Sequence, residues 1–277
     1  MGTLNGLNRV VSTSGSIGTA AALCAVYLYS RLQARTGTPV LAQPNQPSGR
    51  SALASSRLAR RAMQFRMRDG ARVRCRLVDA GSLLSVNVDR DYDLPGIDWA
   101  SMQAIVDIGA HVGTFTLWAA LRAPHARILS VEPNPNTFAF LQRNIADNGL
   151  ADRITAVNAA AGPTQGVGTL ELVEHSLGTR LARNGGGTVT AQVETVPDLL
   201  KRGGIDRIDF LKMDCEGTEY EIFDALDSET LRRFKAIACE YHPVPGRDVS
   251  EIARCLRDSG FQVEVPDARL GLIWAVR

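Results

Sequence analysis

Short apolar runs alternate with longer stretches of helical periodicity over most of the chain after residue 100. Each apolar run has the length of a buried strand, and residues at helical spacing follow it. Strand–helix alternation requires right-handed crossovers, so we predict an α/β fold with a mostly parallel, doubly wound sheet. Strands are predicted at 104–108, 127–131, 154–159, 208–213 and 236–240, and helices at 114–122, 136–148, 197–202, 219–226 and 249–258.

Three further pairs of strands are expected to run antiparallel, because the connection within each pair is too short for a crossover. The last pair closes the chain, so we place an antiparallel hairpin at one edge of the sheet. The pairs are 261–265 with 272–276, 170–173 with 189–193 across Asn184-Gly-Gly-Gly, and 73–78 with 83–88.

The first 68 positions contain no acidic residue, and this divides the chain into two parts. Nine of the 31 basic residues, all of them arginine, precede Asp69, so residues 1–68 carry a formal charge of +9. Residues 69–277 hold the other 22 basic residues and all 29 acidic ones, which gives −7. An acidic surface opposes a phosphate backbone, so we expect no nucleic-acid partner. We predict a basic leader, 1–68, and a folded domain, 69–277.

The leader has an uncharged stretch with arginines on both sides. Residues 10–30 carry no charge, but the apolar part, 17–29, has thirteen residues, short of the roughly 20 that span a membrane. An acid-free leader rich in arginine and serine is also typical of transit peptides. We keep three interpretations: an organellar (mitochondrial or plastid) leader, a membrane anchor through 10–30 with the domain facing the cytoplasm or an uncleaved signal peptide, or a disordered extension. A flexible linker is expected at 36–56. At 58–68 we favour a solvated linker helix over a basic amphipathic helix that lies on a membrane surface.

The segment Val106-Asp-Ile-Gly-Ala-His-Val-Gly joins the strand at 104–108 to the helix after it. Gly109 and Gly113 let the backbone approach a ligand at the carboxyl end of the strand, where open α/β sheets bind nucleotides. Glu132 ends the next strand, 25 residues after Asp107, and is placed to accept hydrogen bonds from ribose hydroxyls. An acid at the strand tip repels a pyrophosphate and attracts a cation. The charge therefore favours the sulfonium of S-adenosylmethionine over NAD, unless Asp107 only caps the turn.

Three other motifs follow the glycine turn: Glu132-Pro-Asn134, Asn158-Ala-Ala and the block 208–221. Together the four motifs resemble those of FkbM-type methyltransferases over residues 104–260. The resemblance implies a Rossmann-like class I methyltransferase fold, S-adenosylmethionine as cofactor, and methylation of hydroxyls on sugars or secondary metabolites. His111 and Pro197 depart from the family pattern, which commonly has Asn and an acid there. The family signature K-x-D-x-E-G-x-E falls on Lys212, Asp214, Glu216, Gly217 and Glu219.

The candidate catalytic residues follow two neighbouring strands. Asp214 and Glu216 project the same way along an extended segment, so two carboxylates share one site and one of them can act as a base. In the alternative, Glu216 with Gly217 shapes the exit of the strand, and Asp214 holds the methionine end of the cofactor. His242 is a second candidate base; with Glu240 it also suggests a metal site, but we predict no metal. The cofactor-binding residues are expected to be Asp107, Gly109, His111, Gly113, Glu132, Asn134 and Asn158.

These observations predict a methyltransferase that uses S-adenosylmethionine to methylate a hydroxyl of a small molecule or glycan. Two alternatives stay open from the sequence: an NAD(P)-binding oxidoreductase of Rossmann type, and a nucleotide-binding module without catalysis. The five cysteines include no C-x-x-C pair, so free thiols are expected rather than a zinc or redox motif.

Overall fold

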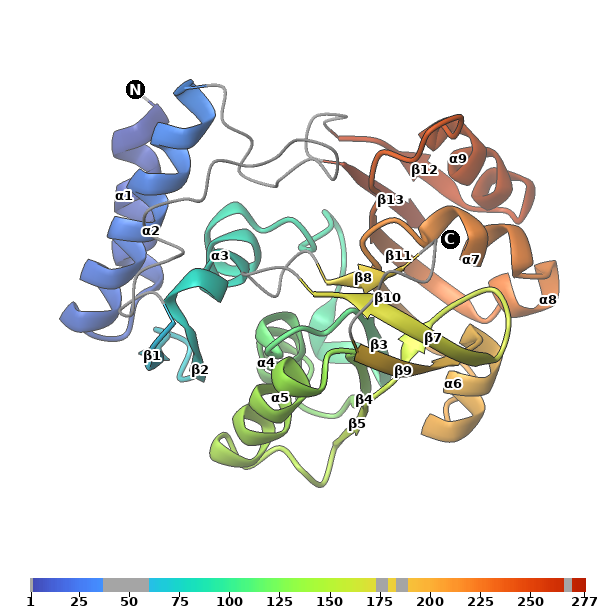
Figure 1. The fold of residues 1–277 in the computed structure, drawn as a ribbon, viewed down its shortest axis with the longest axis horizontal. Helices are drawn as coiled ribbons and strands as arrows, with labels where there is room; N and C mark the ends of the chain where they lie inside the picture. The colour runs from blue at the N-terminus through green and yellow to red at the C-terminus, as the bar shows by residue number, and fades with distance from the viewer. Residues whose placement is uncertain (1, 37–59, 173–178, 183–188, 267–270) are drawn as a thin grey trace.

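Seven strands form the central sheet of the computed structural model, which describes residues 2–36, 60–172, 179–182, 189–266 and 271–277 (Figure 1). The strand order is β12-β13-β11-β10-β3-β4-β5. The strands from β5 to β11 pair in parallel, as the alternation of strands and helices predicts. Their bounds are Ala104–Ile108 (β3), Arg127–Val131 (β4), Ile154–Val157 (β5), Ile208–Asp214 (β10), Phe234–Glu240 (β11), Gln262–Glu264 (β12) and Leu272–Val276 (β13).

The predicted antiparallel hairpin at the sheet edge is confirmed as β12 and β13. Within it, β13 pairs antiparallel with both β11 and β12. The outermost strand, β12, therefore runs in the same direction as the five parallel strands. The sheet is mixed at this end because β13 runs antiparallel to both of its neighbours.

Helices cover both faces of the sheet, which makes it doubly wound. Residues of β3 alternate between two hydrophobic clusters: Ile105 lies in one, and Val106 and Ile108 lie in the other. The first cluster includes residues of α4 (Thr114–Arg122) and α5 (Pro135–Asp147). The second includes residues of α6 (Val196–Gly203), α7 (Glu219–Ala225) and α9 (Val249–Asp258). Strands covered on both faces must be apolar throughout, which explains why they stand out in the sequence.

A smaller four-stranded sheet, with the order β6-β9-β7-β8, lies beside the main one. The predicted pair at 170–173 and 189–193 is confirmed by the antiparallel pairing of β7 and β9, and the Asn184 turn lies outside the described residues. The short strand β8 is not predicted, because two residues give no periodicity. The bounds are Ala160–Ala161 (β6), Gly166–Glu171 (β7), Arg180–Leu181 (β8) and Val189–Glu194 (β9). A further short helix, α8 (Ser228–Leu231), precedes β11.

Two predictions for the segments before β3 are wrong. The expected strand at 83–88 is helical, formed by α3 (Gly81–Leu84) and a π-helical turn, η2 (Ser85–Asp89). Its apolar residues are buried in helical form, so tertiary packing overrides the strand preference of its valines. The expected linker helix at 58–68 is also wrong, because β1 (Ala62–Arg66) pairs antiparallel with β2 (Arg72–Arg76).

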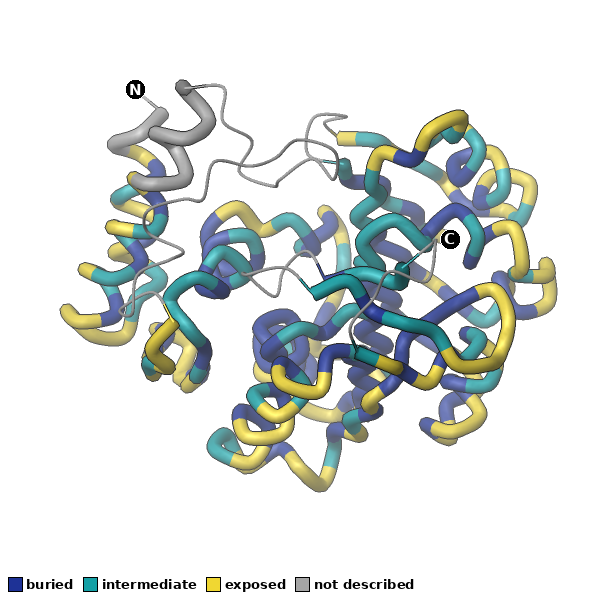
Figure 2. Tube along the Cα trace, viewed as in Figure 1, coloured by how far each residue is buried: buried dark blue, intermediate teal, exposed yellow. Residues whose placement is uncertain are grey.

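Two helices, α1 (Gly2–Thr13) and α2 (Ile17–Thr36), lie side by side at the end of the molecule opposite β12 and β13 (Figure 1). Val10, Leu23 and Tyr27 are buried and belong to the same cluster as the residues of α4 and α5. Figure 2 shows buried and exposed positions alternating along the two helices. Among the helices that the structure describes, none is both long enough and apolar enough to cross a membrane. The organellar or membrane address of the leader stays a prediction.

Candidate active site

The turn between β3 and α4 is fixed between two neighbouring strands. The backbone N–H groups of Gly109 and Ala110 both donate to the Val131 carbonyl at the end of β4, at 2.9 and 2.8 Å. Gly109 has φ +76°, and a Cβ there would lie 1.8 Å from the Asp214 carbonyl oxygen at the end of β10. Only glycine permits both this conformation and this approach. Gly113, also at positive φ, begins α4.

Asp107 is fully buried, and side chains from α4 and β10 contact its carboxylate. Oδ2 accepts a hydrogen bond from the Thr116 hydroxyl at 2.6 Å, and Oδ1 lies 3.5 Å from Lys212 Nζ. Burial raises the pKa of Asp107, while the charge of Lys212 and the Thr116 hydrogen bond act against that rise. Lys212 is the cross-strand partner of Asp107 in the pairing of β10 with β3. Lys212 therefore balances the negative charge of Asp107 within the protein itself.

Glu132 holds the loop between β4 and α5. Its carboxylate accepts from the backbone N–H of His111 and of Asn134, both at 2.9 Å. Burial raises the pKa of Glu132 to about 7 against these hydrogen bonds. The side chain of Asn158 donates to the carbonyls of Glu132 and Pro133, at 2.8 and 3.0 Å. His111 has φ +54°, so the residue that departs from the family pattern stands where the backbone turns sharply.

One cleft runs along the carboxyl ends of β3, β4 and β10. Five of the predicted site residues line it, and the other five are not part of the described lining. Asn134 caps α5, Asn158 braces the Glu132 loop, and His242 stands behind Glu216. The described lining residues are Ile108, Gly109, His111, Val131, Glu132, Pro133, Ala159, Ala160, Ala161, Thr179, Arg180, Leu181, Asp214, Cys215, Glu216 and Thr218.

The loop after β10 folds around Glu219. This fully buried carboxylate accepts from the backbone N–H of Cys215 at 2.8 Å and of Gly217 at 2.9 Å. Its Oε1 also lies 3.0 Å from Nδ1 of His242, so the loop is tied to the segment that follows β11. Glu216 has φ +55°, a strained conformation that the loop enforces and that places its Oε2 3.2 Å from Nε2 of His242.

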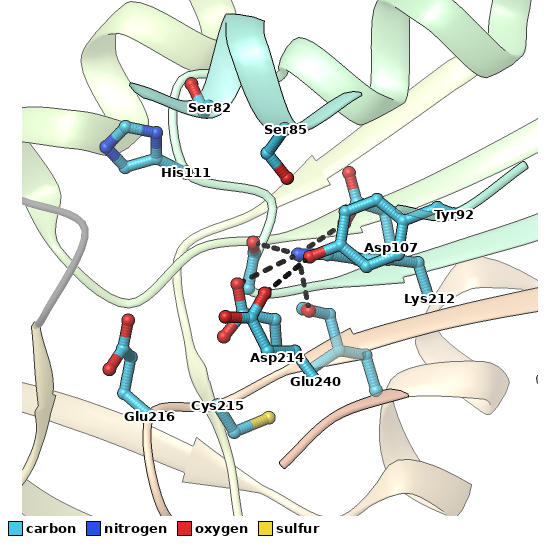
Figure 3. A network of polar contacts seen from close by, with 12 residues as sticks. Ser82, Ser85, Tyr92, Asp107, His111, Lys212, Asp214, Cys215, Glu216 and Glu240 are labelled. Atoms are coloured by element: carbon cyan, nitrogen blue, oxygen red, sulfur yellow. Dashed lines mark hydrogen bonds and ion pairs between the residues drawn. The ribbon is translucent and has the colours of Figure 1, made fainter. Parts of the chain in front are cut away.

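A buried lysine links this loop to the glycine turn (Figure 3). Nζ of Lys212 donates to the Gly109 carbonyl at 2.6 Å and lies 3.7 Å from Asp214 Oδ2. It also lies 5.4 Å from the ring centre of Tyr92, whose hydroxyl donates to Glu240 at 2.9 Å. Sequence reasoning missed Tyr92, which carries no motif. Glu219 could have been identified from the sequence, because it is the last residue of the K-x-D-x-E-G-x-E signature.

Negative charge predominates at this end of the cleft. Within the part of the chain that the structure describes, the ion pairs of the network join five carboxylates (Asp107, Asp214, Glu216, Glu219, Glu240) to two basic side chains, Lys212 and His242. Burial and neighbouring carboxylates raise the pKa of Glu216 and Glu240. Burial lowers the pKa of His242, but the hydrogen bond and charge of Glu219 outweigh it and raise the value to about 10.

These surroundings suit a cationic cofactor better than a pyrophosphate. Glu132, Asp214 and Glu216 line the cleft, and its one described arginine, Arg180, is paired with Glu171 at 2.6 Å. Glu132, the residue that the sequence predicts as the ribose acceptor, is part of this lining, and alanines 159–161 line the cleft as well. The lining therefore fits S-adenosylmethionine, which carries positive charge and no phosphate.

Comparison with known proteins gives one family match and several relatives. The methyltransferase FkbM domain matches residues 107–263. The methyltransferase sdnD of Sordaria araneosa is 28% identical over 209 residues, covering 63% of this chain and 79% of that protein. The 31-O-demethyl-FK506 methyltransferase FkbM of Streptomyces tacrolimicus is 26% identical over 205 residues, covering 63% and 78%.

Two further matches are weaker. The hexuronic acid methyltransferase AglP of Haloferax volcanii is 23% identical over 169 residues, covering 57% of this chain and 63% of that protein. Among solved structures, the METTL16 MTase domain (crystal form 2) aligns with a TM-score of 0.44 and 19% identity, covering 70% of this chain and 66% of that one.

Proposed function

The chain belongs to the FkbM methyltransferase family and is therefore an S-adenosylmethionine-dependent methyltransferase; on that premise we propose that it methylates a hydroxyl group of a small molecule or a glycan. The name of one relative supports methylation at an oxygen, since it acts on a 31-O-demethyl compound. The name of another, a hexuronic acid methyltransferase, supports a sugar as the acceptor. The observation that carries the proposal is that Glu132, Asp214 and Glu216 line one and the same cleft.

The Glu132 end of the cleft is the part that we assign to the cofactor. Glu132 would accept hydrogen bonds from ribose hydroxyls, and Gly109 lets the backbone of the glycine turn approach the ligand. Bound there, S-adenosylmethionine supplies an electrophilic methyl group on a sulfonium. The chain's own contribution is to hold that group and the acceptor in register, which is a large part of catalysis for an in-line displacement.

The other end of the cleft is the part that we assign to the acceptor hydroxyl. Asp214 and Glu216 present carboxylates to the cleft, with His242 directly behind Glu216. We name Asp214, Glu216, Glu219, Glu240 and His242 the His242 cluster. Its carboxylates orient the acceptor through hydrogen bonds from the hydroxyl, and the cluster takes up the proton that leaves as the new O–CH3 bond forms.

Methyl transfer to a panel of hydroxyl-bearing acceptors tests the proposal. The panel should hold uronic acids, neutral sugars and polyhydroxylated macrolides, with amines of matched size as controls. We expect a hydroxyl acceptor to gain one methyl group by mass spectrometry while S-adenosylhomocysteine accumulates. Asp214→Asn should lose turnover and keep S-adenosylhomocysteine binding. Methylation of the amines with none of the alcohols would overturn the acceptor class.

A further inference from the structure

Three side chains of metal-ligand type converge at the acceptor end of the cleft. One ligand atom each from Asp214, Glu216 and His242 lies within 4.8 Å of the other two. Asp214 ends β10, Glu216 follows it in the strained loop, and His242 follows the neighbouring strand β11. Ligands about 2.1 Å from an octahedral cation are about 3 Å apart when adjacent and about 4.2 Å apart when opposite. The three groups are thus close to the spacing that one cation requires.

The orientation of His242 is the second observation. Nδ1 faces the fully buried carboxylate of Glu219 at 3.0 Å, which turns Nε2 toward Glu216, a residue of the cleft lining. A carboxylate behind one ring nitrogen is how proteins commonly orient a histidine that binds a metal through the other. Among the described residues, Nε2 of His242 and Oδ1 of Asp214 are shielded from solvent and have no hydrogen-bond partner. Both side chains therefore retain an unused ligand position.

The charge balance is the third observation. The network joins five carboxylates to one lysine and one histidine, and Lys212 is already engaged by Asp107 and the Gly109 carbonyl. Carboxylates that share a buried site repel one another unless a cation or a proton intervenes. S-adenosylmethionine can neutralise only part of the negative charge of these carboxylates, because its sulfonium contributes a single positive charge. A divalent cation would remove the remaining repulsion.

We propose that Asp214, Glu216 and His242 bind a divalent cation of the Mg²⁺ or Mn²⁺ class, facing the acceptor end of the cleft. Two carboxylates and one imidazole favour these ions over zinc, which prefers more nitrogen and sulfur ligands. The inference rests on the proposed function and deepens it, because an acceptor oxygen completes the coordination and is thereby placed next to the cofactor.

Binding of Mn²⁺ to metal-free protein, followed by electron paramagnetic resonance, tests the site without any turnover. We expect one Mn²⁺ per chain, displaced by excess Mg²⁺. His242→Ala should abolish the bound signal, and Glu219→Gln should weaken binding about 10- to 100-fold, because it removes the charge behind the ligand. His125→Ala is the matched control, since His125 is exposed and outside the His242 cluster. Retained S-adenosylhomocysteine binding would show that each variant is folded.

The outcomes separate this inference from the proposed function. Absence of stoichiometric Mn²⁺ binding by the wild-type chain, or equal binding by His242→Ala, overturns the metal site and supports a plain imidazolium–carboxylate ion pair. Hydroxyl methylation that continues undiminished in EDTA also overturns the metal site, but it leaves the proposed function intact. Stoichiometric Mn²⁺ binding supports the site even if every hydroxyl acceptor in the panel fails, and only the proposed acceptor class falls in that case.

Discussion

Replacing Gly109 by alanine probes the contact that brings the cofactor turn and the signature strand together. The residue has φ +76°, and an alanine in the left-handed region costs roughly 1–2 kcal/mol. The new Cβ would also lie 1.8 Å from the Asp214 carbonyl oxygen and 2.9 Å from its carbonyl carbon. Because these are backbone atoms, no rotamer change relieves the overlap. Either the turn or the end of β10 must move, and overpacking of this kind costs typically about 1–3 kcal/mol.

Gly149 provides the matched control. It has φ +69°, but no atom of the described chain would lie within 4 Å of an added Cβ. Gly149→Ala should therefore cost only the conformational part, about 1–2 kcal/mol, whereas Gly109→Ala should cost about 2–5 kcal/mol. Urea denaturation of both variants gives the two free energies of unfolding. Titration with S-adenosylhomocysteine should show weakened binding for Gly109→Ala alone.

Equal destabilisation by the two alanines would refute the reasoning. It would mean that the turn does not press against β10, and that Gly109 serves only the local backbone conformation. Unchanged S-adenosylhomocysteine affinity in Gly109→Ala would contradict the placement of the cofactor beside this turn.

Three further predictions follow from buried polar groups. Burial raises the pKa of Glu132 to about 7, and binding of S-adenosylhomocysteine needs the ionised carboxylate. In calorimetric titrations the ligand should therefore bind about tenfold more weakly at pH 6 than at pH 8. Glu132→Gln should remove this pH dependence. Lys212→Met leaves Asp107 buried without its cation and should cost about 3–5 kcal/mol at pH 8. Because the variant raises the folded-state pKa of that carboxyl further above its unfolded value, the loss should shrink in urea melts at pH 5. Asn144→Ala removes three hydrogen bonds of a fully buried side chain, two to β2 and one to the turn before α4, and should cost about 2–4 kcal/mol. Asn148→Ala, whose two hydrogen bonds to β2 are exposed, should cost under about 1 kcal/mol in the same assay.

The parts of the fold that could be predicted are those that local sequence determines. Strands covered on both faces are continuous apolar runs, so β3, β4 and β13 begin and end where the sequence predicts. The segment 83–88 has apolar residues that suit either a strand or a helix. Packing against neighbours that are distant in sequence decides its conformation, and the sequence gives no local sign of that packing.

The candidate site divides in the same way. Glu132 and Asp214 follow strands and could be placed at the sheet edge from the sequence alone. The partner of Asp107 could not, because Lys212 becomes its neighbour only through the pairing of β10 with β3. Tyr92 reaches Glu240 from a segment outside the matched domain, so no motif points to it. The hydrogen bond between His242 and Glu219 likewise joins two loops that only the folded sheet brings together.

Isothermal titration of the wild-type chain with S-adenosylmethionine, and separately with NAD, tests the central claim most directly. We expect one S-adenosylmethionine to bind per chain, no binding of NAD, and affinity at least tenfold lower in Glu132→Ala, because the buried ribose acceptor is lost. Binding of NAD without S-adenosylmethionine, or full affinity in the Glu132→Ala variant, would contradict the account.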